Sequence, residues 1–320
     1  MRLLGKSPGG EKNKNIDILF RACGTNRNFP GVMDRMSEIK TVGVVGAGTM
    51  GNGIAHVFAR SGYRVVLCEV ERRFLDRGLE TIRRNLEREA TKGKISPEDV
   101  DDALRLIEGT LDRDSLAECD FIVEAATERF EIKSEIFRDL DRIARPEVIL
   151  ASNTSSISIT KLAAQTKRPD RIIGMHFFNP VPVMKLVEVI RGLATAQATY
   201  DAVQALTEKL GKTAVEVNDA PGFVSNRVLM PLLNEAMYAV MEGVATAQAV
   251  DEVFKLGMAH PMGPLTLADF IGLDVCLDIM RVLHDGLGDP KYRPCPLLIR
   301  MVDAGWLGRK SGRGFYTYEK

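Results

Sequence analysis

Three polar side chains lie near the ends of strand-like runs, and their types suit proton transfer. His176 closes one run, and Glu188 lies in the next, 185–190, beyond a proline-containing loop. A carboxylate beside an imidazole fixes its tautomer and stabilises its protonated form, so this pair suits acid–base chemistry near neutral pH. Ser155 follows a third run, 148–151, so three strand ends could bring these side chains to one point.

A glycine-rich segment earlier in the chain favours this catalytic interpretation, since a lone histidine beside a strand is more often packed or solvated than catalytic. The apolar run 41–45 leads into the pattern G-x-G-x-x-G, and apolar residues with helical spacing follow. The pattern comprises Gly46, Ala47, Gly48, Thr49, Met50 and Gly51. Its glycines permit a tight turn, close approach of a pyrophosphate and close helix–strand packing. We therefore expect a dinucleotide site, with a purely structural turn as the weaker alternative.

An acidic residue follows the glycines at the spacing expected for ribose binding. A second strand-like run, 64–69, ends in Glu69, near the position about 20 residues on at which an acid binds the ribose hydroxyls. A carboxylate there repels the 2′-phosphate of NADP. The sequence thus predicts NAD, with NADP less favoured, although Arg72 and Arg73 could offset part of the repulsion.

Composition indicates an ordinary globular enzyme and argues against several other classes. The 320 residues are 45% apolar and 27% charged with zero formal net charge, so two domains are expected and a nucleic-acid partner is not. The sequence has no run of about 18 apolar residues, so a membrane-spanning helix is not expected. The five cysteines lack a CxxC motif, which suits reduced thiols in the cytoplasm. The four histidines lack the spacing of metal ligands, so no metal site is expected.

Residues 1–37 look foreign to the remainder of the chain. They hold seven Lys and Arg residues against three acids, with scattered Gly and Asn. They contain no apolar core of a secretory signal, and Glu11 and Asp17 argue against the alternative of a mitochondrial presequence. We expect a disordered extension, or an upstream start codon with Met33 or Met36 as the natural beginning.

Residues 38–217 alternate strand-like and helical runs, which predicts a Rossmann-type, doubly wound α/β sheet. The connection after the second strand is long, and we expect a helical hairpin over about 71–107. Ser96 followed by Pro97 is typical of a helix start within it. Basic residues end its first helix, and they allow two interpretations: a solvated face, or a cradle for a polyanionic substrate handle.

Beyond the turn-forming segment 218–222, strand patterns stop and helical ones continue to the end of the chain. The pattern predicts helices over 223–241, 246–256, 264–285 and 295–304, followed by a glycine-rich tail. Residues 218–320 should therefore form an all-helical C-terminal domain. Its apolar faces are wider than one small bundle needs, so we expect a homodimer formed through them.

Residues 40–320 resemble the 3-hydroxyacyl-CoA dehydrogenase family, most closely its bacterial 3-hydroxybutyryl-CoA members. Six motifs in the same order carry the resemblance: VVGAGTMGNGIA, ILASNTSS, GMHFFNPVPVMKLVEVI, PGFVSNR, HPMGPLTLADFIGLD and GWLGRKSGRGFY. It implies a Rossmann domain, a helical domain, and hydride transfer between NAD and an acyl-CoA. The implied reaction interconverts (S)-3-hydroxybutyryl-CoA and acetoacetyl-CoA.

The resemblance also implies roles for individual residues. His176 matches the catalytic base and Glu188 its orienting partner, while Ser155 and Asn226 match the groups that bind the substrate oxygen. The glycine segment and Glu69 match the pyrophosphate and ribose sites. Further positions beside the nicotinamide are matched by Glu128, Lys133, Asn179 and Lys310.

The hairpin is implied to contact the CoA handle through Lys92. Arg88 stands where close relatives carry lysine, which leaves its role in this substrate site less secure. Two other functions remain open: a dehydrogenase of a free 3-hydroxy acid, and a non-enzymatic NAD-binding or structural protein. A free acid would not need the basic hairpin, and a structural protein would not need His176 and Glu188.

Overall fold

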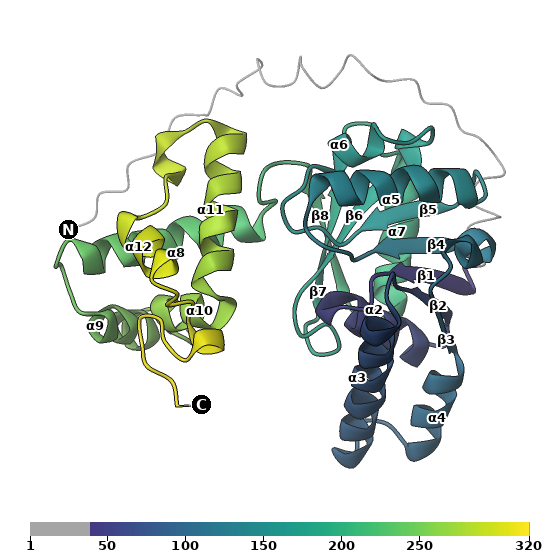
Figure 1. Ribbon diagram of the computed structural model, residues 1–320, viewed down its shortest axis with the longest axis horizontal. Coiled ribbons are helices and arrows are strands. Elements are labelled where there is room, and N and C mark those ends of the chain that lie inside the picture. The colour runs from purple at the N-terminus through teal and green to yellow at the C-terminus, as the bar shows by residue number, and fades with distance from the viewer. Residues whose placement is uncertain (1–38, 320) are drawn as a thin grey trace, which may run out of the picture. The chain divides into compact units, whose positions relative to one another are not determined.

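The computed structural model of the chain describes residues 39–319 (Figure 1). The extension predicted for residues 1–37 lies outside the described residues. Within the described part, an eight-stranded sheet is followed by a helical segment. None of its helices is both long and apolar enough to cross a membrane.

The sheet has the strand order β3-β2-β1-β4-β5-β6-β7-β8. Its strands are β1 Thr41–Val45, β2 Arg64–Cys68, β3 Ile107–Thr110, β4 Phe121–Glu124, β5 Ile149–Ser152, β6 Ile172–Phe177, β7 Leu186–Arg191 and β8 Thr213–Asn218. Neighbouring strands are parallel except β6 and β7, which are antiparallel. The predicted Rossmann-type sheet is confirmed. The edge strand β3, with the short and only partly apolar sequence IEGT, was not predicted.

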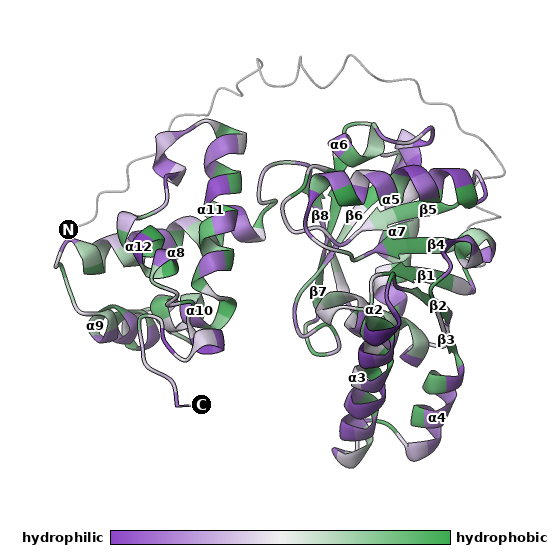
Figure 2. Cartoon of the chain, viewed as in Figure 1, coloured by the Kyte–Doolittle hydropathy of each residue, from purple (hydrophilic) through white to green (hydrophobic). Residues whose placement is uncertain are grey.

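The helices that pack against this sheet include α2 Thr49–Arg60, α5 Phe130–Ile143, α6 Ile159–Ala163 and α7 Gln197–Lys209. Helices α5 and α6 lie along one face of the sheet and share a core cluster with it (Figure 1). Strands β1 and β4 are largely hydrophobic (Figure 2), as expected where both faces of a parallel sheet are covered. These layers bring the carboxyl ends of β1, β4, β5 and β6 to one edge of the sheet.

The predicted helical hairpin consists of α3 Arg72–Thr91 and α4 Pro97–Arg105. Helix α3 is largely hydrophilic (Figure 2) and buries a narrow stripe that includes Leu75, Ile82 and Leu86. The start of α4 is fixed by a capping box. The Ser96 hydroxyl accepts a hydrogen bond from the Asp99 backbone N–H at 3.1 Å, and the Asp99 carboxylate accepts one from the Ser96 N–H at 2.8 Å.

The helical segment comprises α8 Ser225–Met241, α9 Ala247–Glu252, the π-helical turn η4 Val253–Gly257, α10 Pro264–Ile271, α11 Leu273–Leu287 and α12 Pro296–Asp303. Short 3₁₀ turns η2 Arg113–Glu118, η3 Pro169–Arg171, η5 Pro290–Tyr292 and η6 Arg309–Ser311 complete the described elements.

The single helix predicted over 264–285 is wrong, because two helices meet at Gly272. This residue has φ of +106°, a conformation that L side chains rarely adopt and that ends α10. The apolar pattern continues across the break, since both helices pack against one core cluster. Hydrophobic periodicity alone therefore did not reveal the change of direction.

Candidate active site

The antiparallel pairing of β6 with β7 places His176 directly opposite Glu188. Side chains of paired residues in a sheet lie on the same face, and His176 Nδ1 lies 2.8 Å from Glu188 Oε2. Both side chains are buried, and the imidazole also contacts the rings of Phe178 and Phe223, with centroids 4.8 and 6.0 Å away. The sequence predicted neighbouring strands here. The register that aligns these two residues emerges only in the structure.

Glu188 accepts hydrogen bonds from the first turn of α8 as well. The Ser225 N–H donates to Oε1 at 2.9 Å and the Ser225 hydroxyl to Oε2 at 2.9 Å, while the Val224 N–H lies 3.3 Å from Oε1. Burial opposes ionisation of Glu188, but hydrogen bonds from His176 and Ser225 outweigh it and lower the pKa of the carboxyl group. Ser225 was not predicted from the sequence, in which its one signal was its position next to Asn226.

The ionised state of Glu188 determines which nitrogen of His176 is available for chemistry. A carboxylate can only accept hydrogen bonds, so Nδ1 of His176 must be the protonated nitrogen. Nε2 of the neutral ring then carries the lone pair. The pair can therefore take up a proton at Nε2 and stabilise the resulting imidazolium.

Ser155 and Asn226 contact each other, although they lie far apart in sequence. The Asn226 amide donates to the backbone oxygen of Ser155 at 3.2 Å. The loop that carries Ser155 is tied to β6 by Asn153, whose side-chain oxygen accepts from the Phe177 N–H at 2.9 Å. The structure therefore links His176, Glu188, Ser225, Asn226 and Ser155 through consecutive residues and direct contacts.

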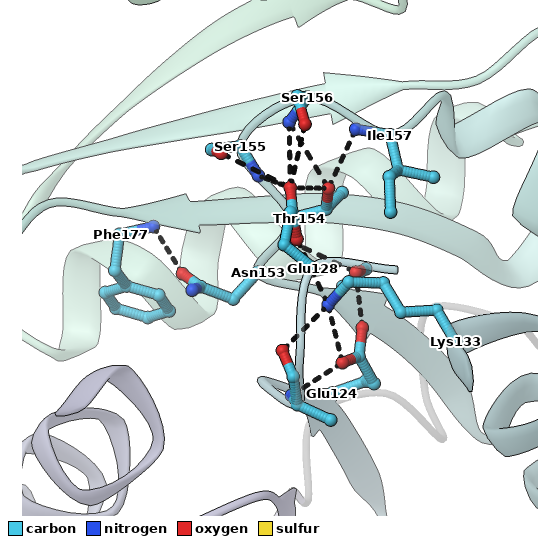
Figure 3. Close-up of polar contacts among 11 residues, drawn as sticks. Glu124, Glu128, Lys133, Asn153, Thr154, Ser155, Ser156, Ile157 and Phe177 are labelled. Atoms are coloured by element: carbon cyan, nitrogen blue, oxygen red, sulfur yellow. Dashed lines mark hydrogen bonds and ion pairs between the residues drawn. The ribbon is translucent and has the colours of Figure 1, made fainter. Parts of the chain in front are cut away.

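Glu128 lies beneath the loop 154–156 and accepts from its backbone and hydroxyl groups (Figure 3). Its Oε1 atom accepts from Thr154 Oγ1 at 2.6 Å and Ser155 N at 2.8 Å, and it lies 3.2 Å from Ser155 Oγ. Its Oε2 atom lies 3.4 Å from Lys133 Nζ. Burial would raise the pKa of Glu128, but Lys133 and these hydrogen bonds lower it overall. In this structure, therefore, the Ser155 hydroxyl is hydrogen-bonded to Glu128.

The glycine segment has the geometry of an anion-binding loop. Gly46 has φ of +99°, and a Cβ atom on Gly51 would lie 1.8 Å from the Gly46 oxygen, so neither position accepts a side chain without rearrangement. Gly48 is the N-cap of α2, and the first turn of this helix carries no acidic side chain, so its N–H groups and helix dipole can face an anion.

Glu69 lies directly beside this loop, with its Oε2 atom 2.8 Å from Ala47 N and its Oε1 atom 2.7 Å from Val70 N. A cavity of about 600 Å³ is lined by Gly48, Glu69 and Asn179, together with Arg77 and Arg84 of α3. Bare glycines, a free helix N-terminus and an adjoining carboxylate fit a dinucleotide. The structure thus groups Asn179 with the glycine segment.

Three other predicted residues lie apart from these groups. Lys310 Nζ pairs with Asp274 Oδ2 of α11 at 2.5 Å and approaches Gly272. Lys92 is the C-cap of α3 and is exposed, and the exposed Arg88 donates to Asn85 at 3.0 Å. Asn85 lines the 600 Å³ cavity, so the basic end of α3 continues from the cavity wall. Within residues 39–319, no group of three or more His, Cys, Asp or Glu side chains is arranged to hold a metal ion.

A Rossmann-type sheet with this glycine loop and an acid after the second strand is typical of NAD-dependent dehydrogenases. Residues 41–220 match the NAD binding domain of 3-hydroxyacyl-CoA dehydrogenase, and residues 222–318 match its C-terminal domain. The chain therefore belongs to the 3-hydroxyacyl-CoA dehydrogenase family.

Individual relatives cover nearly all of the described chain. A protein of Bacillus subtilis, named probable 3-hydroxybutyryl-CoA dehydrogenase, is 59% identical over 283 residues, which cover 88% of this chain and 99% of the relative. A 3-hydroxybutyryl-CoA dehydrogenase of Bradyrhizobium diazoefficiens is 55% identical, with 88% and 96% covered. The crystal structure of an (S)-3-hydroxybutyryl-CoA dehydrogenase from Ralstonia eutropha superposes with a TM-score of 0.87 at 52% identity, with 88% and 100% covered.

Proposed function

We propose that this protein uses NAD to interconvert (S)-3-hydroxybutyryl-CoA, or a similar short-chain 3-hydroxyacyl-CoA, and acetoacetyl-CoA. The observation that carries the proposal is the buried pair His176 and Glu188, with 2.8 Å between Nδ1 and Oε2, in a chain of this family. The names of the relatives at 55–59% identity support the four-carbon acyl group.

In the direction of oxidation, Nε2 of His176 takes the proton of the substrate 3-hydroxyl group, and Glu188 stabilises the imidazolium. The nicotinamide of bound NAD would accept the hydride that leaves C3 of the substrate, and NADH would return it in the reverse direction. The Asn226 amide has two N–H groups, and only one is needed for the Ser155 carbonyl, so the other can donate to the substrate oxygen. The Ser155 hydroxyl must turn from Glu128 to do the same.

We assign the pyrophosphate to the glycine segment 46–51 and the adenosine ribose to Glu69. Asn179, Glu128 and Lys133 are proposed for the nicotinamide side, in keeping with their positions at the same sheet edge. Lys310 is proposed there too, on the resemblance alone, since its contact in the structure is with Asp274. A carboxylate beside the ribose favours NAD over NADP.

The CoA handle is assigned to the basic end of α3, with Lys92 and Arg88 as its phosphate contacts. Arg77 and Arg84 on the same helix line the cavity that contains Glu69, which supports a basic path for a polyanion along α3. The competing interpretation is a solvated face that contacts no substrate.

We also propose that the protein forms a homodimer through its C-terminal helices and works in the cytoplasm. Large apolar side chains that are exposed there include Val224, Val228, Val244, Val253, Leu256, Met258, Phe270 and Val275. An apolar surface of this kind favours association. The four described cysteines are free and buried, which suits a reducing compartment. Light scattering should give the mass of a dimer, and Leu256→Asp should lower the measured mass toward that of a monomer.

The deciding experiment compares NADH oxidation with acetoacetyl-CoA and with free acetoacetate. The proposal expects turnover with the thioester, and His176→Gln should lower kcat at least ~10²-fold with little change in NADH affinity. Preference for free acetoacetate would favour a hydroxy-acid dehydrogenase. NADH binding without turnover of either compound would favour a non-enzymatic role.

A further inference from the structure

The carboxylate of Glu124 is fully buried at the end of β4, and sequence analysis gave it no role. Its Oε1 atom accepts hydrogen bonds from Ala126 N and Lys133 Nζ, both at 2.7 Å, and its Oε2 atom accepts from Ser152 Oγ at 2.7 Å. A buried carboxylate is unfavourable unless it is paired and hydrogen-bonded, and these three donors meet that need. The group is therefore held in one defined position.

Both side-chain partners of Glu124 lead to the loop that carries Ser155. Figure 3 shows the route through Lys133 and Glu128. The Ser152 hydroxyl accepts from the Thr154 N–H at 3.2 Å. Lys133 approaches Glu128 at 3.4 Å, and Glu128 in turn contacts the backbone and hydroxyl of Ser155. Two separate series of contacts thus connect one buried carboxylate to the same loop.

Lys133 is shared between two carboxylates of unequal exposure. Its side chain is 1% exposed, and its ammonium group lies 2.7 Å from Glu124, 3.2 Å from the Ala126 carbonyl oxygen and 3.4 Å from Glu128. Glu124 is fully buried, whereas the Glu128 side chain is 38% exposed. The shorter contact to the fixed carboxylate keeps the ammonium from moving fully to Glu128. It therefore limits how strongly Glu128 and Lys133 hold each other.

We propose that Glu124 is a positioning residue for the reaction: it fixes Lys133, and through Lys133, Glu128 and Ser152 it sets the conformation in which Ser155 meets the substrate. Glu124 is too deeply buried to touch the substrate, so it acts only through these neighbours. The inference rests on the function proposed above, in which Ser155 binds the substrate oxygen. It adds to that function a positioning residue on β4, a strand on which none of the proposed catalytic residues lies.

The test is Glu124→Gln, which keeps the size of the side chain and removes its charge. Lys133 should then move toward Glu128 and shift the Ser155 loop, and small misplacements of reacting groups can lower rates by about 10²-fold. We expect kcat with acetoacetyl-CoA to fall between ~10- and ~100-fold, while KM for acetoacetyl-CoA changes less than ~3-fold because the CoA handle binds elsewhere.

A double-mutant cycle separates positioning through Lys133 from a general loss of stability. If Glu124 acts mainly through Lys133, adding Glu124→Gln to Lys133→Met should lower kcat by no more than the ~3- to ~10-fold expected for the Ser152 contact. A double variant whose loss of kcat equals the product of the two single losses would overturn the proposal. Ser152→Ala removes one neutral donor and provides a milder variant if Glu124→Gln does not fold, with an expected kcat loss of ~3- to ~10-fold. An unchanged kcat in Ser152→Ala would then count against the proposal.

The matched control is Asp141→Asn, on the same helix as Lys133. Asp141 pairs with Arg168 at 2.8 Å, and both side chains are 10% exposed. This variant should lower the melting temperature and leave kcat within ~2-fold of the wild type, because a structural ion pair does not set the Ser155 loop. Wild-type protein that does not turn over acetoacetyl-CoA would refute the proposed function. Active wild type with an equally active, folded Glu124→Gln would refute only the inference on Glu124.

Discussion

Replacing Glu188 with glutamine tests the proposed proton transfer most directly, because the change is almost isosteric. The wild-type carboxylate has donors at both oxygens: His176 Nδ1 and Ser225 Oγ at Oε2, and the Ser225 N–H at Oε1. A glutamine offers one oxygen and one NH₂ group in the same space. It therefore cannot accept from both sides at once.

Each orientation of the new amide has a defined cost. If its oxygen faces the backbone N–H groups, its NH₂ donates to Nδ1 of His176, which puts the proton on Nε2 and opposes the imidazolium. If its oxygen faces His176, its NH₂ meets the N–H of Ser225, and each unsatisfied buried donor costs about 1–3 kcal/mol. Either result weakens general acid–base catalysis, which typically contributes 10²- to 10⁴-fold.

We expect kcat for NADH-dependent reduction of acetoacetyl-CoA to fall about 10²- to 10⁴-fold in Glu188→Gln, with KM for NADH nearly unchanged. Ser225→Ala is the companion variant, because it removes one donor and leaves the carboxylate as an acceptor. Its expected loss is about 10-fold, from one charge-assisted hydrogen bond of about 1.5 kcal/mol. A folded Glu188→Gln enzyme within ~3-fold of wild-type kcat would refute the assigned role of the pair.

Three other predictions concern the cofactor, the hairpin and a buried histidine. The value of kcat/KM should be at least ~10-fold higher for NADH than for NADPH, and Glu69→Gln should make the two values more similar. A clear preference of the wild type for NADPH would contradict the role assigned to Glu69. Lys92→Ala should raise KM for acetoacetyl-CoA without changing kcat. The increase in KM should shrink with added salt, since charges are screened over ~10 Å at 0.1 M. An unchanged KM would mean that the basic cluster is a solvated face that contacts no substrate. Burial, only partly opposed by Glu89, lowers the pKa of His56 from 6.5 to about 4. The unfolded chain therefore binds the proton first as the pH falls, so up to about 3 kcal/mol of stability present above pH 6.5 should be lost between pH 6.5 and 4. Urea unfolding at pH 7 and pH 5 should reveal this loss in the wild type, and an equal loss in His56→Gln would assign it to other groups.

The parts of the fold that local patterns determine were predicted from the sequence. The glycine loop follows from the needs of a tight turn, and the helix start at Ser96 follows from a capping side chain with proline directly after it. The break at Gly272 was not predicted, because the apolar face continues across it and both helices share one core. The edge strand β3 was missed for a related reason, since four residues are too few to establish a period.

The part of the candidate site that was predicted from the sequence is the part in which one residue type suggests a particular partner. A histidine and a carboxylate on successive strands indicated a pair, but their alignment depends on the β6–β7 register. Glu124 could not be recognised from sequence, because an acid at the end of an apolar strand has no distinctive local pattern. Its role depends on Lys133 and Ser152, which reach it only after the sheet has formed.

The first turn of α8 explains why the site needs residues from both matched domains. Ser225 and Asn226 are consecutive, so their side chains leave the helix in directions about 100° apart. One contacts Glu188 on β7, and the other contacts the backbone of Ser155 after β5. A single helical turn therefore serves both the group that orients the base and the loop proposed to bind the oxygen. Any displacement of this turn would loosen both contacts together, so the proposed proton transfer and the proposed oxygen binding would be affected together.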